Sequence, residues 1–152
     1  MNVFFAEQES EPTPYAPPRA SGRPFDWNPR HAIGIDAIDA GHRRFCEALN
    51  RIAEDSARGD TAAAMRGFNE LGRDIEAHFT AIEALLPALD ESVRVEHQRE
   101  HDRLVDELSH LIVDWEHGHV SATVICHFLH SWLIHHIDEM DRELADALRK
   151  PL

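Results

Sequence analysis

The feature that most constrains this 152-residue chain is a helical repeat of apolar residues that runs from about residue 38 almost to the C-terminus. Apolar side chains recur at intervals of three and four, and no segment alternates as a half-buried strand would. Gly59, Pro87 and Gly118 interrupt the repeat where a helix should end. The predicted helices are approximately residues 39–57, 61–86, 92–116 and 121–149. Because the connections are short, the sequence predicts an all-α, up-down-up-down antiparallel four-helix bundle.

The first 24 residues differ from the rest of the chain. They hold five of the eight prolines and little periodic hydrophobicity, which predicts a disordered or extended Pro-rich tail over residues 1–24. The next segment, FDWNPRHAIGID, mixes apolar residues with Pro29 and Gly34. It predicts an ordered, non-helical lead-in to a single bundle domain over residues 25–152.

The charge excludes several classes of partner. The chain has 15 basic and 28 acidic residues and a formal net charge of -13, which argues against nucleic acid and against anionic membrane surfaces. No apolar run is long enough for a transmembrane helix, and the N-terminus lacks the basic start of a signal peptide. Cys46 and Cys126 have no motif spacing and are expected to be thiols. We therefore expect a cytoplasmic protein.

Twelve histidines need an explanation, and five of them lie on the apolar helix faces: His42, His78, His97, His101 and His136. A single buried histidine is usually hydrogen-bonded within the core. An unpaired one costs about 1–3 kcal/mol, and these faces offer no obvious polar partners. A shared transition-metal centre would satisfy all five, because imidazole suits iron, copper, nickel or zinc.

The spacing within two helices supports a metal centre. His97 and His101 are four residues apart, so both rings can point at one metal. Asp141 follows His136 by five residues, one more than the ideal separation. This carboxylate therefore needs a locally widened helical turn or a long reach.

The motifs FDW, GIDAIDAGH, HF, HQREH and WLIHHIDEMD, in this order, resemble the hemerythrin family, in particular its bacterial single-domain members. The resemblance runs from about Phe25 to the last helix. It implies a bundle holding two iron ions that bind dioxygen reversibly. It also implies the metal ligands: His97, His101 and His136 for the first iron, His42 and His78 for the second, and Asp141 as a bridge between them.

The sequence departs from the family at one position. A bridging glutamate is expected four residues after the histidine of the HF motif, where this chain has Ile82. His78 and His97 keep the family's separation of nineteen residues, so no insertion displaces the motif. Losing one anionic ligand should open a coordination position on the second metal to external ligands.

Three interpretations of Ile82 remain open. In the first, Ile82 continues the apolar face, and the irons share Asp141 with an oxo, hydroxo or small carboxylate bridge. In the second, Glu83 reaches the metals through a π-bulge, because an ideal helix places it roughly 140° from His78. In the third, the second metal binds weakly or not at all, which leaves His97, His101, His136 and Asp141 around one ion.

Other residues near the site have simpler explanations. Cys46 lies one turn after His42, on the far side from the position of Ile82, and is expected to be a small core residue. Asp39 is expected to cap the first helix. Four residues are candidates for the apolar lining of a ligand pocket, although ordinary core packing fits them equally well: Phe79, Ile82, Trp132 and Leu133.

The expected function is a non-heme iron protein that binds dioxygen or a related small molecule for storage, delivery or sensing. The alternative is an enzyme, a non-heme diiron oxidase or peroxidase that uses the opened metal site. A third class is a metal-stabilised interaction module that contacts a protein partner through the Pro-rich tail.

Overall fold

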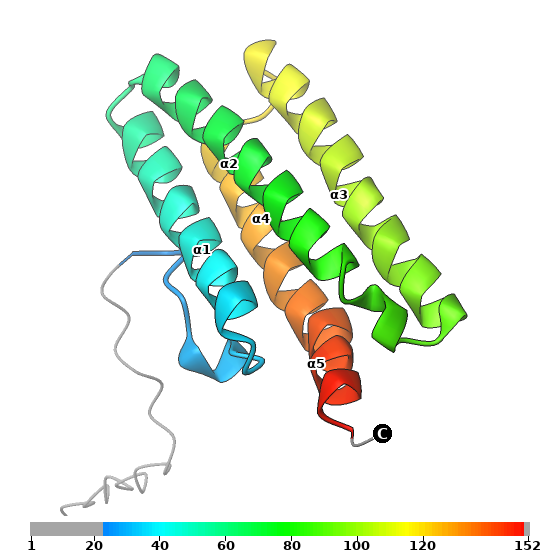
Figure 1. The fold of residues 1–152 in the computed structure, drawn as a ribbon. Coiled ribbons are helices and arrows are strands. Elements are labelled where there is room, and N and C mark those ends of the chain that lie inside the picture. Colours follow the sequence, from blue (N-terminus) through cyan, green and yellow to red (C-terminus); the bar gives the residue numbers. More distant parts are fainter. Residues whose placement is uncertain (1–22, 151–152) are drawn as a thin grey trace, which may run out of the picture.

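The computed structural model describes residues 23–150, which form an antiparallel bundle of helices in the predicted order (Figure 1). No strand occurs in this part of the chain. The all-α four-helix bundle is therefore confirmed. Its α-helices are α1 (Asp36–Ala57), α2 (Thr61–Glu83), α3 (Glu91–Glu116), α4 (Ala122–His136) and α5 (Arg142–Arg149).

The ends of the helices follow local chemistry. The Asp60 side chain accepts a hydrogen bond from the Ala63 N–H at 2.9 Å and caps α2. Gly59 and Gly118 have φ of 75°, a left-handed conformation that only glycine adopts without strain, and they end the turns after α1 and α3. α2 stops at Glu83, three residues earlier than predicted. Pro87 lies in the separate 3₁₀ turn η2 (Leu86–Ala88), because proline cannot continue an α-helix.

The last predicted helix is continuous but not uniform. α4 passes into a π-helical turn, η3 (Ile137–Asp141), which leads directly into α5. Within η3 the Arg142 N–H donates to the carbonyl oxygen of Ile137, five residues earlier. Of the two arrangements that the spacing of His136 and Asp141 allowed, a widened turn or a long reach, the widened turn is present.

The segment before α1 is ordered and packs on the bundle. Phe25 is fully buried, and its N–H donates to Oδ1 of Asn50 in α1 at 3.0 Å. Asp39 does not cap α1, whose N-cap residue is Ile35. Instead its carboxylate accepts from the N–H groups of Ile33 and Gly34, at 2.9 and 3.0 Å, and so fixes the lead-in. The predicted tail lies, except for its last two residues, outside the described part of the chain.

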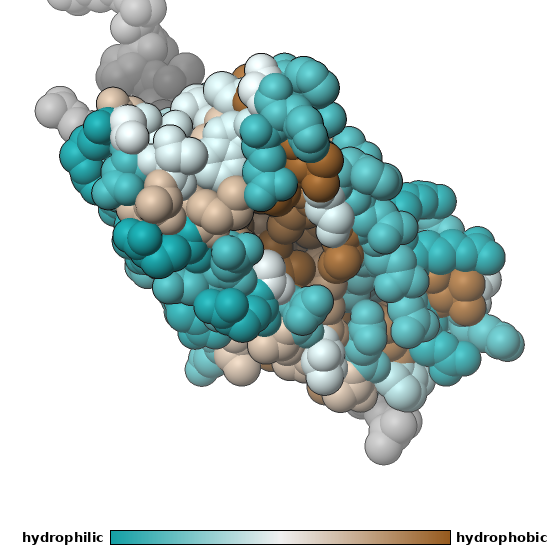
Figure 2. Space-filling model, turned by 90° about the horizontal axis from the view of Figure 1, so that it is seen from above, coloured by the Kyte–Doolittle hydropathy of each residue, from teal (hydrophilic) through white to brown (hydrophobic). Residues whose placement is uncertain are grey.

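The helices of the bundle are not equally well packed against one another. α1 packs most extensively against α2 and α4, whereas α3 makes few contacts with its neighbours. Only four of the 26 residues of α3 are buried, and two of these, His97 and His101, are histidines. Seen from above, hydrophobic residues reach the surface between hydrophilic flanks (Figure 2). Among the described residues, no helix combines the length and hydrophobicity needed to cross a membrane.

Candidate metal centre

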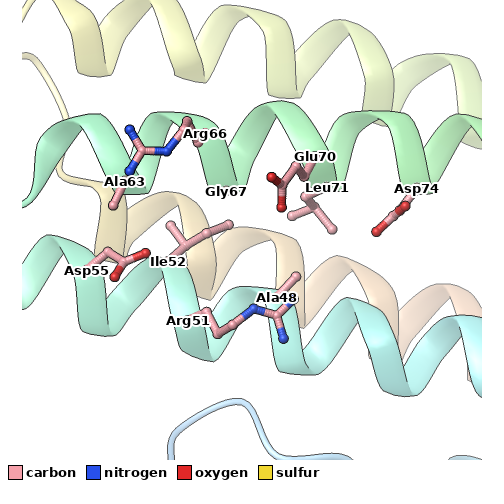
Figure 3. A pocket seen from close by; sticks show the side chains of 10 residues that line it. All are labelled: Ala48, Arg51, Ile52, Asp55, Ala63, Arg66, Gly67, Glu70, Leu71 and Asp74. Atoms are coloured by element: carbon pink, nitrogen blue, oxygen red, sulfur yellow. The ribbon is translucent and has the colours of Figure 1, made fainter.

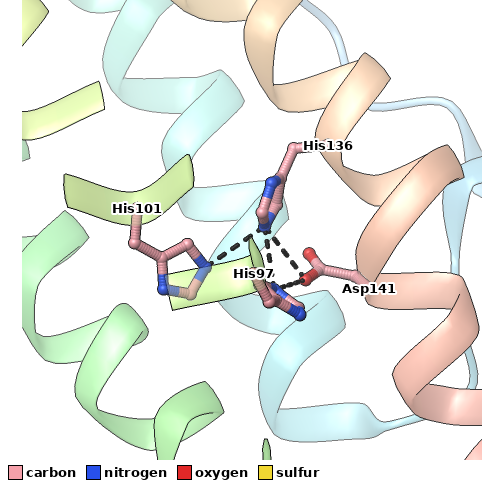
Figure 4. A group of neighbouring side chains, drawn as sticks. All are labelled: His97, His101, His136 and Asp141. Carbon is pink, nitrogen blue, oxygen red and sulfur yellow. Dashed lines mark hydrogen bonds and ion pairs between the residues drawn. The ribbon is translucent and has the colours of Figure 1, made fainter. Parts of the chain in front are cut away.

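Three elements bring four predicted ligands together in the bundle (Figure 4). His97 and His101 come from α3, His136 is the last residue of α4, and Asp141 is the last residue of η3. All four are buried, and their potential ligand atoms lie within 4.8 Å of one another. The π-turn is what brings Asp141 to the same side of its helix as His136.

The spacing within this group fits a metal ion. The Nε2 atom of His136 lies 3.1 Å from that of His97 and 3.2 Å from that of His101. Oδ1 of Asp141 lies 3.1 Å from Nε2 of His97 and 3.2 Å from Nε2 of His136. Ligands bound at right angles with bonds of about 2.2 Å are separated by about 3.1 Å. These atoms therefore have the separation of adjacent positions around one octahedral ion.

Asp141 also reaches a second group of histidines. Its Oδ2 lies 3.1 Å from Nε2 of His42, while its Oδ1 faces His97 and His136. Both oxygens are buried, and neither has a hydrogen-bond partner despite these short contacts. The carboxylate thus lies between imidazole nitrogens on both sides, an arrangement that two bridged cations would also stabilise.

His78 of α2 completes the second group. Its ring centroid lies 4.7 Å from that of His42 in α1. The Nδ1 of His42, the Nε2 of His78 and the Nδ1 of His97 are buried without hydrogen-bond partners. An uncompensated buried polar group costs about 1–3 kcal/mol. At Nε2 of His78 a metal would remove this cost directly.

The protonation states favour metal binding. Burial, together with nearby His42, lowers the pKa of His78 to about 4. Burial, together with His136 and His97, lowers the pKa of His101 to about 3. Burial alone would raise the pKa of Asp141, but contacts with His136, His42 and His97 hold it well below its usual range. Near neutral pH these two imidazoles are uncharged and the carboxylate is ionised, as metal ligands must be.

Glu83 contacts the outer edge of the first group. Its Oε1 lies 3.3 Å from Nδ1 of His101, the nitrogen on the opposite side of the ring from the cluster. α2 stays α-helical through Glu83, without a π-turn. Ile82 is fully buried at the position where the resemblance places a bridging carboxylate. Glu83 therefore contacts the outer side of a candidate ligand, His101, and does not lie between the two groups of histidines.

Two of the four expected pocket residues contact candidate ligands, and the other two are core residues. Phe79 stacks on His101, with ring centroids 3.7 Å apart and planes at 3°. Trp132 stacks on His136 at 4.5 Å and 14°. Ile82 and Leu133 are buried in the core. Two of the four thus cover the flat faces of imidazole rings, a role that their position in the sequence did not reveal.

The thiols are core residues. Cys46 and Cys126 are buried, and burial raises the pKa of each to about 12. A thiol with such a pKa stays protonated and is a poor metal ligand. This agrees with the expectation that Cys46 is a small core residue.

Two neighbours of the site were not anticipated. Trp27 of the lead-in stacks on His42, with ring centroids 5.9 Å apart and planes at 30°. In the sequence, the only indication of this contact was that residue 27 is aromatic, which is a weak signal. Gly41 lies so close to His78 that a Cβ atom there would be 2.5 Å from Nδ1 of His78. A glycine inside a helix, directly before a candidate ligand, was the signal for this close approach.

Comparisons with known proteins agree with this geometry. The family model described as "Hemerythrin HHE cation binding domain" matches residues 33–148. The chain is 26% identical over 126 residues to the bacteriohemerythrin of Stenotrophomonas maltophilia, covering 83% of this chain and 82% of the relative. It is 29% identical over 127 residues to that of Ralstonia nicotianae, covering 82% and 88%. No solved structure gives a significant match. The chain belongs to the hemerythrin family.

Proposed function

We propose that the protein is a non-heme iron protein that binds dioxygen or a related small molecule at a dinuclear site with one protein carboxylate bridge. The position of Asp141 carries this proposal, because its two oxygens face two different groups of histidines. The proposed ligands are His97, His101 and His136 for one iron, His42 and His78 for the other, and Asp141 for both. When bound, ferrous iron supplies the electrons and the open coordination position that dioxygen binding requires.

The surrounding residues orient the ligands. Glu83 accepts a hydrogen bond from Nδ1–H of His101, which directs the lone pair of Nε2 into the site. Phe79 and Trp132 hold the rings of His101 and His136 and exclude water from their outer faces. These contacts fix the tautomer and the ring orientation before a metal arrives.

Metal content and oxygen binding test this proposal. We expect two irons per chain, and a visible absorption band that forms when the ferrous protein meets oxygen and fades under vacuum. One tight ion per chain would leave only the group of His97, His101, His136 and Asp141. A chain that takes up no iron would contradict the proposal altogether.

An oxidase or peroxidase is the second candidate, and Ile82 is the observation that favours it. An apolar residue replaces a bridging ligand, so the second iron would have only His42, His78 and Asp141 from the protein. Two histidines and one carboxylate are the ligands of many oxygen-activating iron enzymes. Fast, irreversible oxidation by oxygen, or turnover with peroxide and a reducing dye, would favour the enzyme over the carrier.

A further inference from the structure

A cavity of about 260 Å³ lies between α1 and α2, beside His78 of the second group of histidines. Ala37, Gly41 and Arg44 of α1 form part of one wall, and His78 and Ala81 form part of the other. A neighbouring cavity of about 250 Å³ between the same helices is lined by charged residues such as Arg51, Arg66 and Glu70 and contains no histidine (Figure 3). Only the first of these two cavities reaches a candidate metal ligand.

His78 differs from the other candidate histidines in its exposure. It is half-buried, whereas His42, His97, His101 and His136 are buried. Its Nε2 is nevertheless buried and has no hydrogen-bond partner. The ring therefore spans the wall between the cavity and the interior of the bundle.

Small residues line this cavity beside His78. A Cβ atom at Gly41 would lie 2.5 Å from Nδ1 and 2.8 Å from Cε1 of His78, so any side chain at position 41 would have to displace the ring. Ala37 and Ala81 are exposed residues of opposite walls of the cavity, Ala37 in α1 and Ala81 in α2. Larger side chains at positions 37 and 81 would fill the space in front of His78.

We propose that this cavity is the entrance through which a small ligand, dioxygen or an anion such as azide, reaches the metal held by His42 and His78. This inference rests on the proposed function. Arg44 is exposed in the cavity wall and makes no ion pair with another described residue. Its charge attracts anions to the opening, although Asp74 in the opposite wall opposes it in part.

Filling the cavity tests the entrance. In the iron-loaded protein, Ala81→Leu should slow azide association, followed by stopped-flow absorbance, by at least about tenfold, because the ligand must wait for the side chain to move. The number of irons per chain should not change. Ala37→Leu fills the cavity from the opposite wall and should have the same effect if Ala81→Leu disturbs iron binding.

Ala62→Leu is the matched control. Ala62 is an exposed residue in the first turn of α2, far along the helix from His78. The substitution adds the same side-chain volume, and the association rate should stay within about twofold of the wild type. If both cavity-filling variants also bind azide at the wild-type rate, the entrance is not here.

Arg44→Gln separates charge from space. Azide association should slow and become less dependent on salt, whereas association of uncharged dioxygen should not change. Equal effects on both ligands would contradict the role of Arg44. Whether the cavity is the entrance would then be decided by the cavity-filling variants Ala81→Leu and Ala37→Leu.

A metal-free measurement keeps this proposal distinct from the proposed function. Diethyl pyrocarbonate modifies accessible neutral imidazoles, and mass spectrometry locates the modified residue. In the metal-free protein we expect His78 to react faster than the other four site histidines, and Ala81→Leu to protect it. Slow modification of His78 would contradict the entrance even if iron binds. A chain that takes up no iron would contradict the proposed function, and fast modification of His78 that Ala81→Leu slows would then show only that His78 is accessible from the cavity.

Discussion

At the scale of single residues, Ile82 and Glu83 define how this site departs from the expected ligand set. Ile82 is fully buried, and Glu83 contacts Nδ1 of His101. The sequence shows an apolar residue where the resemblance implies a bridging carboxylate, with an acid directly after it, and it left three interpretations of this pair open. It could not assign a partner to Glu83, because that partner comes from α3, eighteen residues further along the chain.

Ile82→Glu should supply a second bridging carboxylate. We expect tighter binding of the second iron, measured by competition with a chelator, because the dinuclear site gains an anionic ligand. Without metal, the buried charge should lower the free energy of unfolding by about 3–5 kcal/mol, measured by urea denaturation. Ile82→Leu is the control and should change neither quantity much. Unchanged iron affinity in Ile82→Glu would show that position 82 does not face the metals.

Glu83→Ala should weaken iron binding by about 10- to 100-fold, as the loss of a hydrogen-bond partner of a metal-bound histidine does. Glu83→Gln retains an acceptor and should recover most of the affinity. Glu76→Ala removes an exposed glutamate from the same helix and is the control. If Glu83→Ala and Glu76→Ala bind iron equally well, the contact with His101 does not contribute to the site.

At the scale of elements, two features of this bundle shape the candidate site: the weakly packed helix α3 and the π-turn η3. The π-turn was predictable, because the five-residue offset between His136 and Asp141 cannot place both side chains on one face of an ordinary α-helix. The limited packing of α3 was not predictable. Its apolar repeat continues through Leu111 and Trp115, but both are only partly buried in the bundle.

Leu104→Ala tests how α3 is held. Leu104 and Leu108 are the two buried apolar residues of α3, and Leu104 is only 1% exposed. The substitution should lower the free energy of unfolding of the metal-free protein by about 2–5 kcal/mol. Hydrogen exchange should increase mainly in α3 and less in α1 and α2. An equal increase of hydrogen exchange in all helices would contradict the expectation that α3 opens separately from the other helices.

At the scale of the whole molecule, metal binding and folding should be coupled. His97 and His101 provide half of the buried side chains of α3, and their metal-facing nitrogens lie within 3.2 Å of His136. Removing iron with a chelator should therefore increase hydrogen exchange in α3 most, and adding iron should reverse the change. Uniform exchange with and without metal would contradict this coupling.

The stability of the metal-free protein should also depend on pH. The pKa of His78 is about 4 and that of His101 about 3 in the folded protein, against an ordinary histidine value of 6.5, so the unfolded chain binds more protons in acid. The contribution of these two groups should be fully present above about pH 7 and fall as the pH decreases from about 6.5 to about 4 for His78 and to about 3 for His101. Urea midpoints at several pH values would measure it. In His78→Phe the dependence should become shallower.

If iron binds as proposed, the structure of α3 depends on nutrient supply. A helix whose buried side chains are half imidazole would lose an anchor whenever iron is scarce. Newly made chains would then expose α3 to proteases, so we expect the cellular lifetime of the protein to follow iron availability.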